Sequence, residues 1–216
     1  MVFESRQDAG ARLAHRLRAL GVEVDLVAGL PRGGVVVAAE VAEALERPLE
    51  VLVVRKVGHP WHREFAVGAL AEDGVLILDK SAIAAAPLST AELETVIQEE
   101  KERLREYSYK FRQARNNNFA GRRVLLVDDG LATGATAEAA VYSAREKKAR
   151  QIILAVPVAS APAYERLARA ADQVVALVTD RDFAAVGQYY KRFDPTSDAE
   201  VLALLQRQYA DYGPAT

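Results

Sequence analysis

The feature that most constrains the fold is a regular alternation of apolar runs and helical segments in the second half of the chain. From residue 124 onward, each short apolar run is followed by a stretch with helical spacing. The pattern predicts strands at 124–127, 152–156 and 174–178, and helices at 136–147 and 163–170. Strands and helices that alternate at this spacing form a parallel sheet with helices on both faces.

The first half of the chain begins in the same way. Its spacing predicts a helix from Ser5 to Gly21, a strand at 24–28, a helix at 35–46 and a strand at 49–54. The loop between this first strand and second helix has the sequence GLPRGG. These elements extend the same parallel sheet.

Between the second and third parallel strands the pattern changes. Two apolar runs within 65–78 flank Glu72-Asp73-Gly74, which predicts a hairpin. Ser89 and Glu92 form a capping-box pattern that opens a long helix at 90–115. We therefore expect an α/β fold with a doubly wound, mainly parallel sheet that carries an antiparallel excursion and a long helix.

Composition narrows the range of functions. The chain has 28 Lys and Arg against 30 Asp and Glu, so its near-neutral charge argues against a nucleic acid or membrane partner. It has no Cys, which excludes thiolate zinc sites and a cysteine nucleophile. The first residues are charged throughout and no apolar run approaches the roughly 20 residues of a membrane helix. We expect a soluble, cytoplasmic protein without a signal peptide.

The segment with the clearest chemistry is VLLVDDGLATGAT, residues 124–136. Four apolar residues bring Asp128 and Asp129 to the end of a strand, where they point to opposite sides and suit ribose hydroxyls or a hydrated metal ion. The small residues 133–136 then open a helix, whose free backbone N–H groups form a site for a phosphomonoester. A Walker A loop is excluded because no Lys follows Gly134, and a dinucleotide fingerprint because no Gly-x-Gly-x-x-Gly is present there.

Residues 124–136 closely resemble the phosphoribosyl-pyrophosphate (PRPP) motif of type I phosphoribosyltransferases, in which a hydrophobic strand precedes two acids and a Thr/Ser-Gly-x-Thr/Ser loop. The resemblance covers the core, from about residue 24 to residue 178, and implies that fold. It implies that Asp128 and Asp129 contact the ribose hydroxyls and hold Mg²⁺ through water. It also assigns the 5′-phosphate to the loop residues Ala132, Thr133, Gly134, Ala135 and Thr136.

Two further segments fit the pyrophosphate end of PRPP. Arg32, Gly33 and Gly34 follow the first strand, where the family places its pyrophosphate loop, and two glycines allow close approach of an anion. Arg55 and Lys56 are expected to close the second strand and to add positive charge. Residues 57–64 resemble the mobile loop of the family.

The resemblance implies a hood at 179–196 that holds the acceptor, with Phe183, Val186 and Tyr190 as its binding residues. Where branches acting on 6-oxopurines have an acid in the phosphate loop, this chain has Ala132. A hypoxanthine or guanine acceptor is therefore disfavoured, and Glu64 is the candidate for the catalytic base beside the two aspartates.

The expected organisation is a single domain, 1–216, with an inserted loop, hairpin and long helix at 57–118. The expected activity is Mg²⁺-dependent transfer of phosphoribose from PRPP to a nitrogen nucleophile, with release of pyrophosphate, by a possible homodimer. A non-catalytic protein that senses PRPP or a nucleotide is the main alternative. A phosphoacceptor domain using Asp180 is a third, although it leaves the first 120 residues unexplained.

Overall fold

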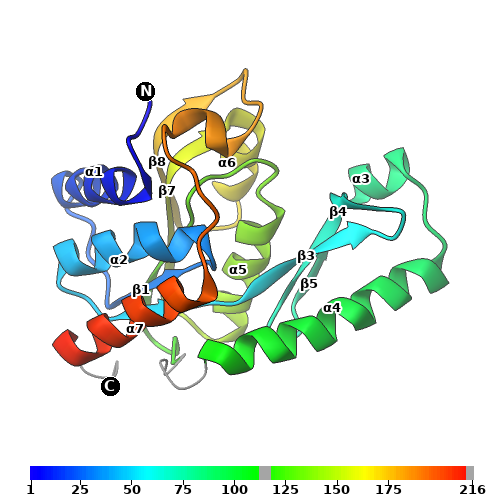
Figure 1. Cartoon of the computed structure of the whole chain (residues 1–216), viewed down its shortest axis with the longest axis horizontal. Coiled ribbons are helices and arrows are strands. Elements are labelled where there is room, and N and C mark those ends of the chain that lie inside the picture. The colour runs from blue at the N-terminus through cyan, green and yellow to red at the C-terminus, as the bar shows by residue number, and fades with distance from the viewer. Residues whose placement is uncertain (112–117, 213–216) are drawn as a thin grey trace.

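The centre of the molecule is a parallel sheet of five strands in the order β2-β1-β6-β7-β8 (Figure 1). The computed structural model describes residues 1–111 and 118–212, apart from the side chains of Glu64 and of residues 209–212. The strands are β1 (Leu26–Gly29), β2 (Leu49–Val51), β6 (Arg123–Val127), β7 (Gln151–Ser160) and β8 (Gln173–Asp180). Every neighbouring pair runs parallel, which confirms the predicted sheet.

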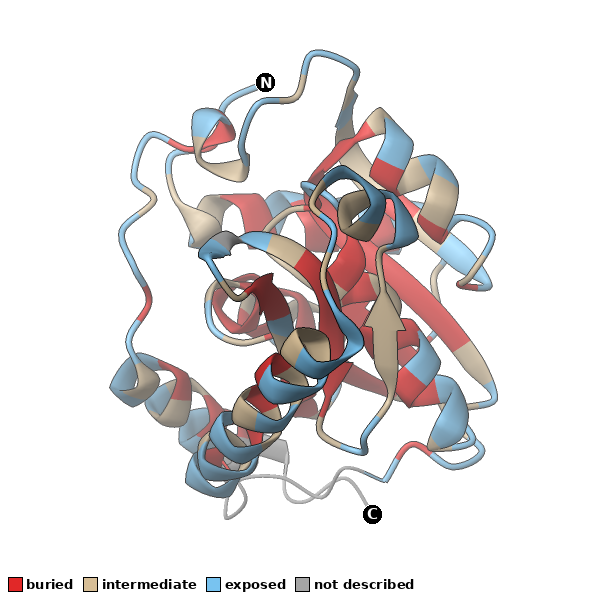
Figure 2. Ribbon diagram, turned by 90° about the vertical axis from the view of Figure 1, so that its right-hand side faces the viewer, coloured by how far each residue is buried: buried red, intermediate tan, exposed pale blue. Residues whose placement is uncertain are grey.

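Alternate residues of the strands pack against different layers of helices. Val27, Leu125 and Ile153 belong to the core cluster that includes α1 (Arg6–Ala19), α2 (Gly33–Leu45) and α7 (Asp198–Tyr212). Their neighbours along the strands pack with α5 (Ala135–Glu146) and α6 (Ala161–Leu167) on the opposite face. Figure 2 shows that the buried residues concentrate in the strands and in the helix faces turned toward them.

The chain between β2 and β6 forms an arm at one side of this sheet (Figure 1). We use this name for β3 (Val54–His59), β4 (His62–Ala71), β5 (Leu76–Leu78), α3 (Lys80–Ala85) and α4 (Thr90–Phe111). The three strands form an antiparallel sheet in the order β3-β4-β5. The predicted capping box is confirmed, because Glu92 N donates to Ser89 Oγ over 3.3 Å and Ser89 N donates to Glu92 Oε2 over 2.9 Å.

Two expectations about the arm are wrong. Arg55 and Lys56 do not close a parallel strand, because β2 ends at Val51 and both residues lie in β3 of the antiparallel sheet. Residues 57–64, which resemble the mobile loop of the family, do not form a loop throughout but the tip of the β3–β4 hairpin, where His59 pairs with His62. The prediction failed because it ended a strand at the first charges, whereas an antiparallel strand with one open face accommodates charged side chains.

The start of the chain is fastened to the segment after β8. Phe3 N donates to the Tyr189 carbonyl over 2.7 Å, and Lys191 N donates to the Phe3 carbonyl over 2.8 Å. Tyr189 ends the short helix η2 (Val186–Tyr189), and the buried Phe3 ring lies 5.4 Å from the Tyr190 ring.

Within the described ranges, no helix has the length and apolar character needed to cross a membrane.

Candidate active site

The loops after β1 and β6 lie side by side because these strands are neighbours in the sheet. Gly29 at the end of β1 pairs with Val127 at the end of β6, and Leu30 N donates to the Val127 carbonyl over 2.9 Å. The peptide bond between Pro31 and Arg32 is cis. Ligands of open α/β sheets bind at this edge, beyond the carboxyl ends of the strands.

Two glycines allow the loops to touch. A Cβ atom on Gly33 would overlap the Asp129 carboxylate, and one on Gly34 would lie 2.8 Å from the Cα atom of Asp128. Helix α2 can therefore begin beside the two aspartates only because these positions lack side chains. Both glycines were predicted from the sequence to approach a ligand, and the structure places them against the aspartates.

Asp128 and Asp129, the acid pair, differ in their surroundings. The Asp128 carboxylate accepts a hydrogen bond from Asp129 N over 2.8 Å, whereas Asp129 Oδ2 lies 2.8 Å from Arg6 Nε. Burial raises the pKa of Asp128 well above its usual range, and the charge of Asp129 raises it further. Burial also raises the pKa of Asp129, whereas the nearby Arg6 guanidinium acts in the opposite direction and lowers this pKa. Two carboxylates with one guanidinium favour the binding of a further cation.

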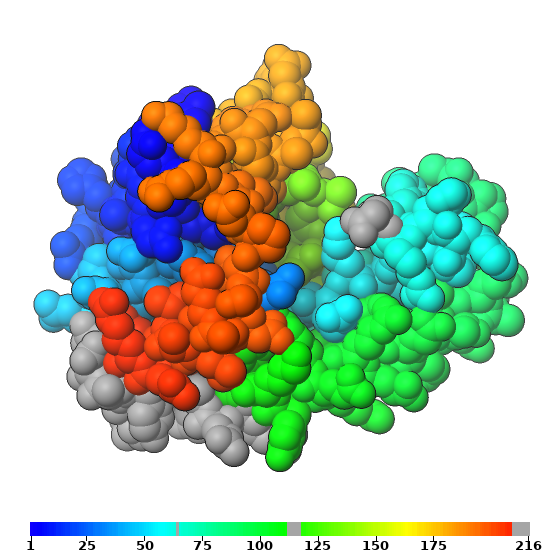
Figure 3. Space-filling model, in the orientation of Figure 1, coloured from blue at the N-terminus to red at the C-terminus, as the bar shows by residue number. Residues whose placement is uncertain are grey.

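Two clefts meet at Asp128. The first has a volume of about 750 Å³ and the second of about 520 Å³, and Lys56, Asp128 and Thr136 line both. Arg32 and Gly33 border the first cleft, whereas residues 130–137 border the second. Figure 3 shows the surface hollowed between the arm and the rest of the molecule.

The predicted phosphate loop lies in the second cleft. Gly134 has the left-handed conformation, φ 77°, and stands at the N-cap of α5, so the first N–H groups of this helix are not used within it. The Ser160 hydroxyl donates to the Ala132 carbonyl over 2.6 Å and accepts from Ala163 N over 3.2 Å, which ties the loop to the start of α6. Phe65 and Ala82 of the arm also line this cleft.

The first cleft contains functional groups that the sequence analysis missed. Besides Arg32, Arg55 and Lys56, it is lined by five further polar residues of the arm and of α7: Arg63, Glu100, Arg103, Tyr107 and Asp198. The burial of Glu100 could have been predicted from the sequence, because this charged residue lies four positions from both Val96 and Leu104 on the apolar side of α4. Nothing in the sequence around Asp198 indicates that this residue lines the cleft.

The predicted acceptor residues pack against their neighbours, and two of the three lie beside the acid pair. The Tyr190 hydroxyl donates to the Asp129 carbonyl over 2.6 Å, and Val186 contacts the backbone at Gly130. The ring of Phe183 stacks on Tyr189 at 5.5 Å. None of the three is among the residues that line the two clefts described above.

The hairpin tip carries the remaining candidates. Glu64 belongs to β4, but its side chain lies outside the described part of the structure. Trp61 is 75% exposed, and its Nε1 donates to Glu92 Oε1 over 3.3 Å. His59 is buried, with its ring 5.8 Å from that of His62.

Comparison with known proteins identifies the family. The phosphoribosyl transferase domain model matches residues 4–191. A Mycobacterium tuberculosis protein, itself only provisionally assigned as a phosphoribosyl transferase, is 45% identical over 215 residues, which are 99% of this chain and 48% of the relative. The chain thus spans about half the length of the curated relatives it matches.

Two solved structures are similar to this chain over nearly its whole length. A crystal structure of a Thermus thermophilus protein is 46% identical with a TM-score of 0.79, and covers 96% of this chain and 99% of that one. A Neisseria gonorrhoeae protein solved with bound ppGpp shares the fold alone, at 14% identity and a TM-score of 0.51 over 95% of this chain and 96% of that one. The family match over residues 4–191 establishes that the chain belongs to the phosphoribosyl transferase domain family.

Proposed function

We propose that the protein transfers 5-phosphoribose from PRPP to a nitrogen nucleophile, a nucleobase or related amine, and releases pyrophosphate. The observation that carries the proposal is the position of Asp128, which lines both clefts. Arg32 and the start of α2 border one cleft, and the start of α5 borders the other. A ribose with a phosphate group at one end and a pyrophosphate at the other matches this arrangement.

In the proposed reaction, the bond from C1 of the ribose to pyrophosphate breaks and a bond from C1 to nitrogen forms, while the nucleophile loses a proton. The ribose becomes positively charged in the transition state, so the protein must mainly hold the reactants and stabilise charge. We assign the ribose hydroxyls to Asp128 and Asp129, the 5′-phosphate to residues 132–136, and the pyrophosphate to Arg32, the adjacent glycines, Arg55 and Lys56.

The acid pair also fits Mg²⁺, the cofactor that we propose. Among the described residues, there is no group of three or more carboxylate or histidine side chains that could hold a metal. Two carboxylates are enough for Mg²⁺, which keeps several waters and takes its remaining oxygens from substrate phosphates. When bound, the ion would neutralise charge on the pyrophosphate, and Asp128 and Asp129 would hold it through water.

Phe183, Val186 and Tyr190 remain the proposed acceptor residues, because they lie on the segment next to the acid pair. Ala132 provides no acid for the N7 proton of a 6-oxopurine, so we propose another acceptor and Glu64 as its base. We also propose that residues 1–216 act as one domain, as a homodimer, without a nucleic acid or membrane partner.

Calorimetric titration of PRPP, with and without Mg²⁺, tests the proposal. Binding should strengthen with Mg²⁺ and weaken at least about tenfold in Asp128→Asn, the effect of one lost charged hydrogen bond. Pyrophosphate release should then identify the acceptor among adenine, pyrimidines and simple amines. Saturable binding without release from any acceptor would favour the alternative, a non-catalytic sensor of PRPP or a nucleotide, and absence of binding would contradict both.

A further inference from the structure

Helix α4 places a carboxylate within its buried apolar face. Val96, Glu100 and Leu104 follow one another at intervals of four residues, and all three are buried. Val96 and Leu104 join the hydrophobic core, whereas the Glu100 side chain lies between them with 6% of its surface exposed. A buried carboxylate requires charged or hydrogen-bonding partners, and here it has two.

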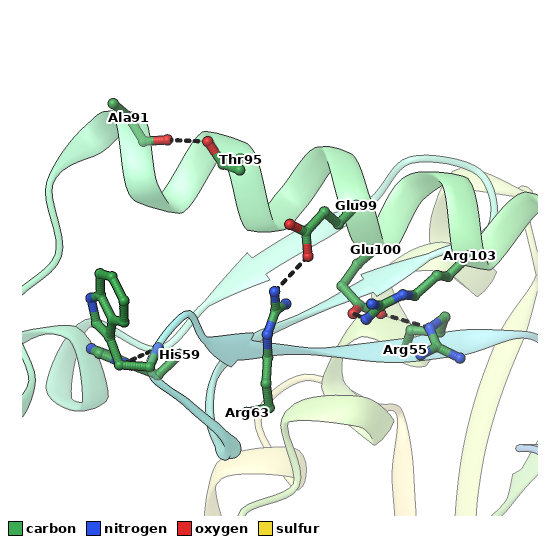
Figure 4. Close-up of polar contacts among 9 residues, drawn as sticks. Arg55, His59, Arg63, Ala91, Thr95, Glu99, Glu100 and Arg103 are labelled. Carbon is green, nitrogen blue, oxygen red and sulfur yellow. Dashed lines mark hydrogen bonds and ion pairs between the residues drawn. The ribbon is translucent and has the colours of Figure 1, made fainter.

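Each Glu100 oxygen holds one arginine (Figure 4). Arg55 Nε of β3 lies 2.7 Å from Oε2, and Arg103 Nη1 lies 2.6 Å from Oε1. The two arginine side chains remain 33% and 52% exposed, and both line the first cleft. We call Arg55, Glu100 and Arg103 the arginine clamp.

A purely structural role accounts for only half of the clamp. The contact between Arg55 and Glu100 fastens β3 to α4. The contact between Arg103 and Glu100 joins two residues of the same helix, so it adds no link between elements. Arg103 is also more than half exposed, so part of its guanidinium faces the cleft and not the core.

The composition of the clamp suits an anion. Two guanidinium groups on one carboxylate leave a net positive charge, to which Lys56 adds from the same strand. A guanidinium has five N–H donors in a planar fork that matches the geometry of phosphate oxygens, and Glu100 engages only part of that fork. The remaining donors can therefore bind an oxyanion in the cleft.

The rest of the cleft indicates which oxyanion. Arg32 lines it together with the acid pair, and Arg32 Nη1 lies 3.8 Å from Asp198 Oδ1. Tyr107, one helical turn beyond Arg103 on α4, lines the same cleft as Asp198. The cleft thus carries cations both on the arm and at the start of α2, an arrangement suited to a group with several negative charges.

We propose that the arginine clamp binds the terminal phosphate of a diphosphate group, and that Glu100 is a positioning residue that orients both guanidinium groups. Helix α4 is then part of the ligand site rather than a packing element alone. The inference rests on the proposed function for the identity of the donor, because PRPP would bring its diphosphate to this cleft. Binding of the diphosphate itself can be measured without turnover.

The test uses calorimetry on the full chain with inorganic pyrophosphate, PRPP and ribose 5-phosphate. Arg103→Gln should weaken pyrophosphate and PRPP by about tenfold or more, through loss of a charged hydrogen bond, and leave ribose 5-phosphate unchanged. Arg103→Lys should recover only part of the affinity, because an ammonium lacks the planar fork. Arg105→Gln, the same charge change at an exposed position of α4, should affect none of the three ligands.

Glu100→Gln tests the positioning role. It should also lower the affinity for pyrophosphate and not for ribose 5-phosphate, a selectivity that a general loss of folding stability would not produce. Equal pyrophosphate affinities of Arg103→Gln and Arg105→Gln would overturn the clamp, as would a weakening confined to ribose 5-phosphate. If PRPP binding still depends on Asp128 in that case, the proposed function stands. Pyrophosphate binding that depends on Arg103, without binding of PRPP or ribose 5-phosphate, would keep the clamp and overturn the proposed function.

Discussion

Arg6 and Asp129, which are 123 positions apart in the sequence, form a largely buried ion pair of 2.8 Å within the candidate active site. The Arg6 Nη1 atom also donates to the Asp194 carbonyl over 2.8 Å, and the guanidinium lies 3.9 Å from the centre of the Phe193 ring. Tyr190 donates to the backbone of Asp129 from the same segment. One member of the acid pair is therefore held by residues near both ends of the chain.

Breaking this ion pair should destabilise the fold. Arg6→Gln leaves Asp129 without its charged partner, and loss of one member of a buried pair costs about 3–5 kcal/mol. The double variant Arg6→Gln/Asp129→Asn should lose less than the sum of the two single changes, because it removes both charges. Urea unfolding measures the effect. Arg12→Gln, which breaks a more exposed pair with Asp8, is the control and should cost less than about 1 kcal/mol; equal losses at Arg6 and Arg12 would contradict the prediction.

Gly33→Ala should impair ligand binding more than folding. The added methyl group would overlap the Asp129 carboxylate and move the start of α2. Forcing such a contact typically lowers the free energy of unfolding by about 1–3 kcal/mol. Displacement of the loop should also weaken binding, and the Kd for PRPP rises about tenfold for each 1.4 kcal/mol of binding free energy that is lost. Gly74→Ala is the control: its φ of 92° is strained for alanine, yet the β4–β5 turn lies away from both clefts. An unchanged PRPP affinity in Gly33→Ala would count against the proposed site.

Ser160→Ala should affect stability and phosphate binding together. Its hydroxyl serves as the N-cap of α6 and holds the Ala132 carbonyl, and loss of an N-cap costs about 0.5–2 kcal/mol. The freed phosphate loop should then bind ribose 5-phosphate more weakly. Ser143→Ala removes a buried hydroxyl that donates to Asp73 over 2.7 Å, and should reduce stability without changing ligand affinity. Thermal unfolding and calorimetry on both variants separate the two effects.

Acid should weaken the contact between Asp25 and Arg123. Hydrogen bonds from the Arg123 side chain lower the pKa of Asp25, so the folded protein binds this proton less readily than the unfolded chain. The stabilisation is complete above the unfolded pKa of about 3.9 and is lost as the pH falls through the lower folded value. Asp25→Asn should therefore be less stable than the natural chain at pH 7, with the gap closing toward pH 2. Glu23→Gln, at an exposed partner of Arg123, should change stability little; a gap that stays constant with pH would rule out the linkage.

Local patterns predicted the elements well where each pattern had one physical cause. The buried parallel strands read as apolar runs, and the Ser89 capping box marked the start of α4 to the residue. The expectation failed at Arg55 and Lys56, because a strand of a partly open antiparallel sheet can hold charges that a buried parallel strand cannot.

The site was predicted to the extent that it consists of consecutive residues. Asp128, Asp129 and the loop at 132–136 follow one strand, so their proximity is a local property. Arg6 and Asp198 reach the same region only through tertiary packing, and nothing in their neighbours in the sequence indicates it. Glu100 lies between these cases, because its position on an apolar helix face signals a buried charge without naming its partners.

The attachment of Phe3 to residues 189–191 has a consequence for biosynthesis. Synthesis proceeds from the N-terminus, so residues 3–6 leave the ribosome long before residues 189–194, and wait for a partner segment that is made later. The parallel sheet can begin to assemble earlier, from β1, β2 and β6. Until residues 193 and 194 have been made, the Arg6 side chain that pairs with Asp129 lacks its contacts with Phe193 and Asp194. A nascent chain arrested before residues 189–194 would already contain the phosphate loop and the acid pair, but the contacts that complete the site around them could not form.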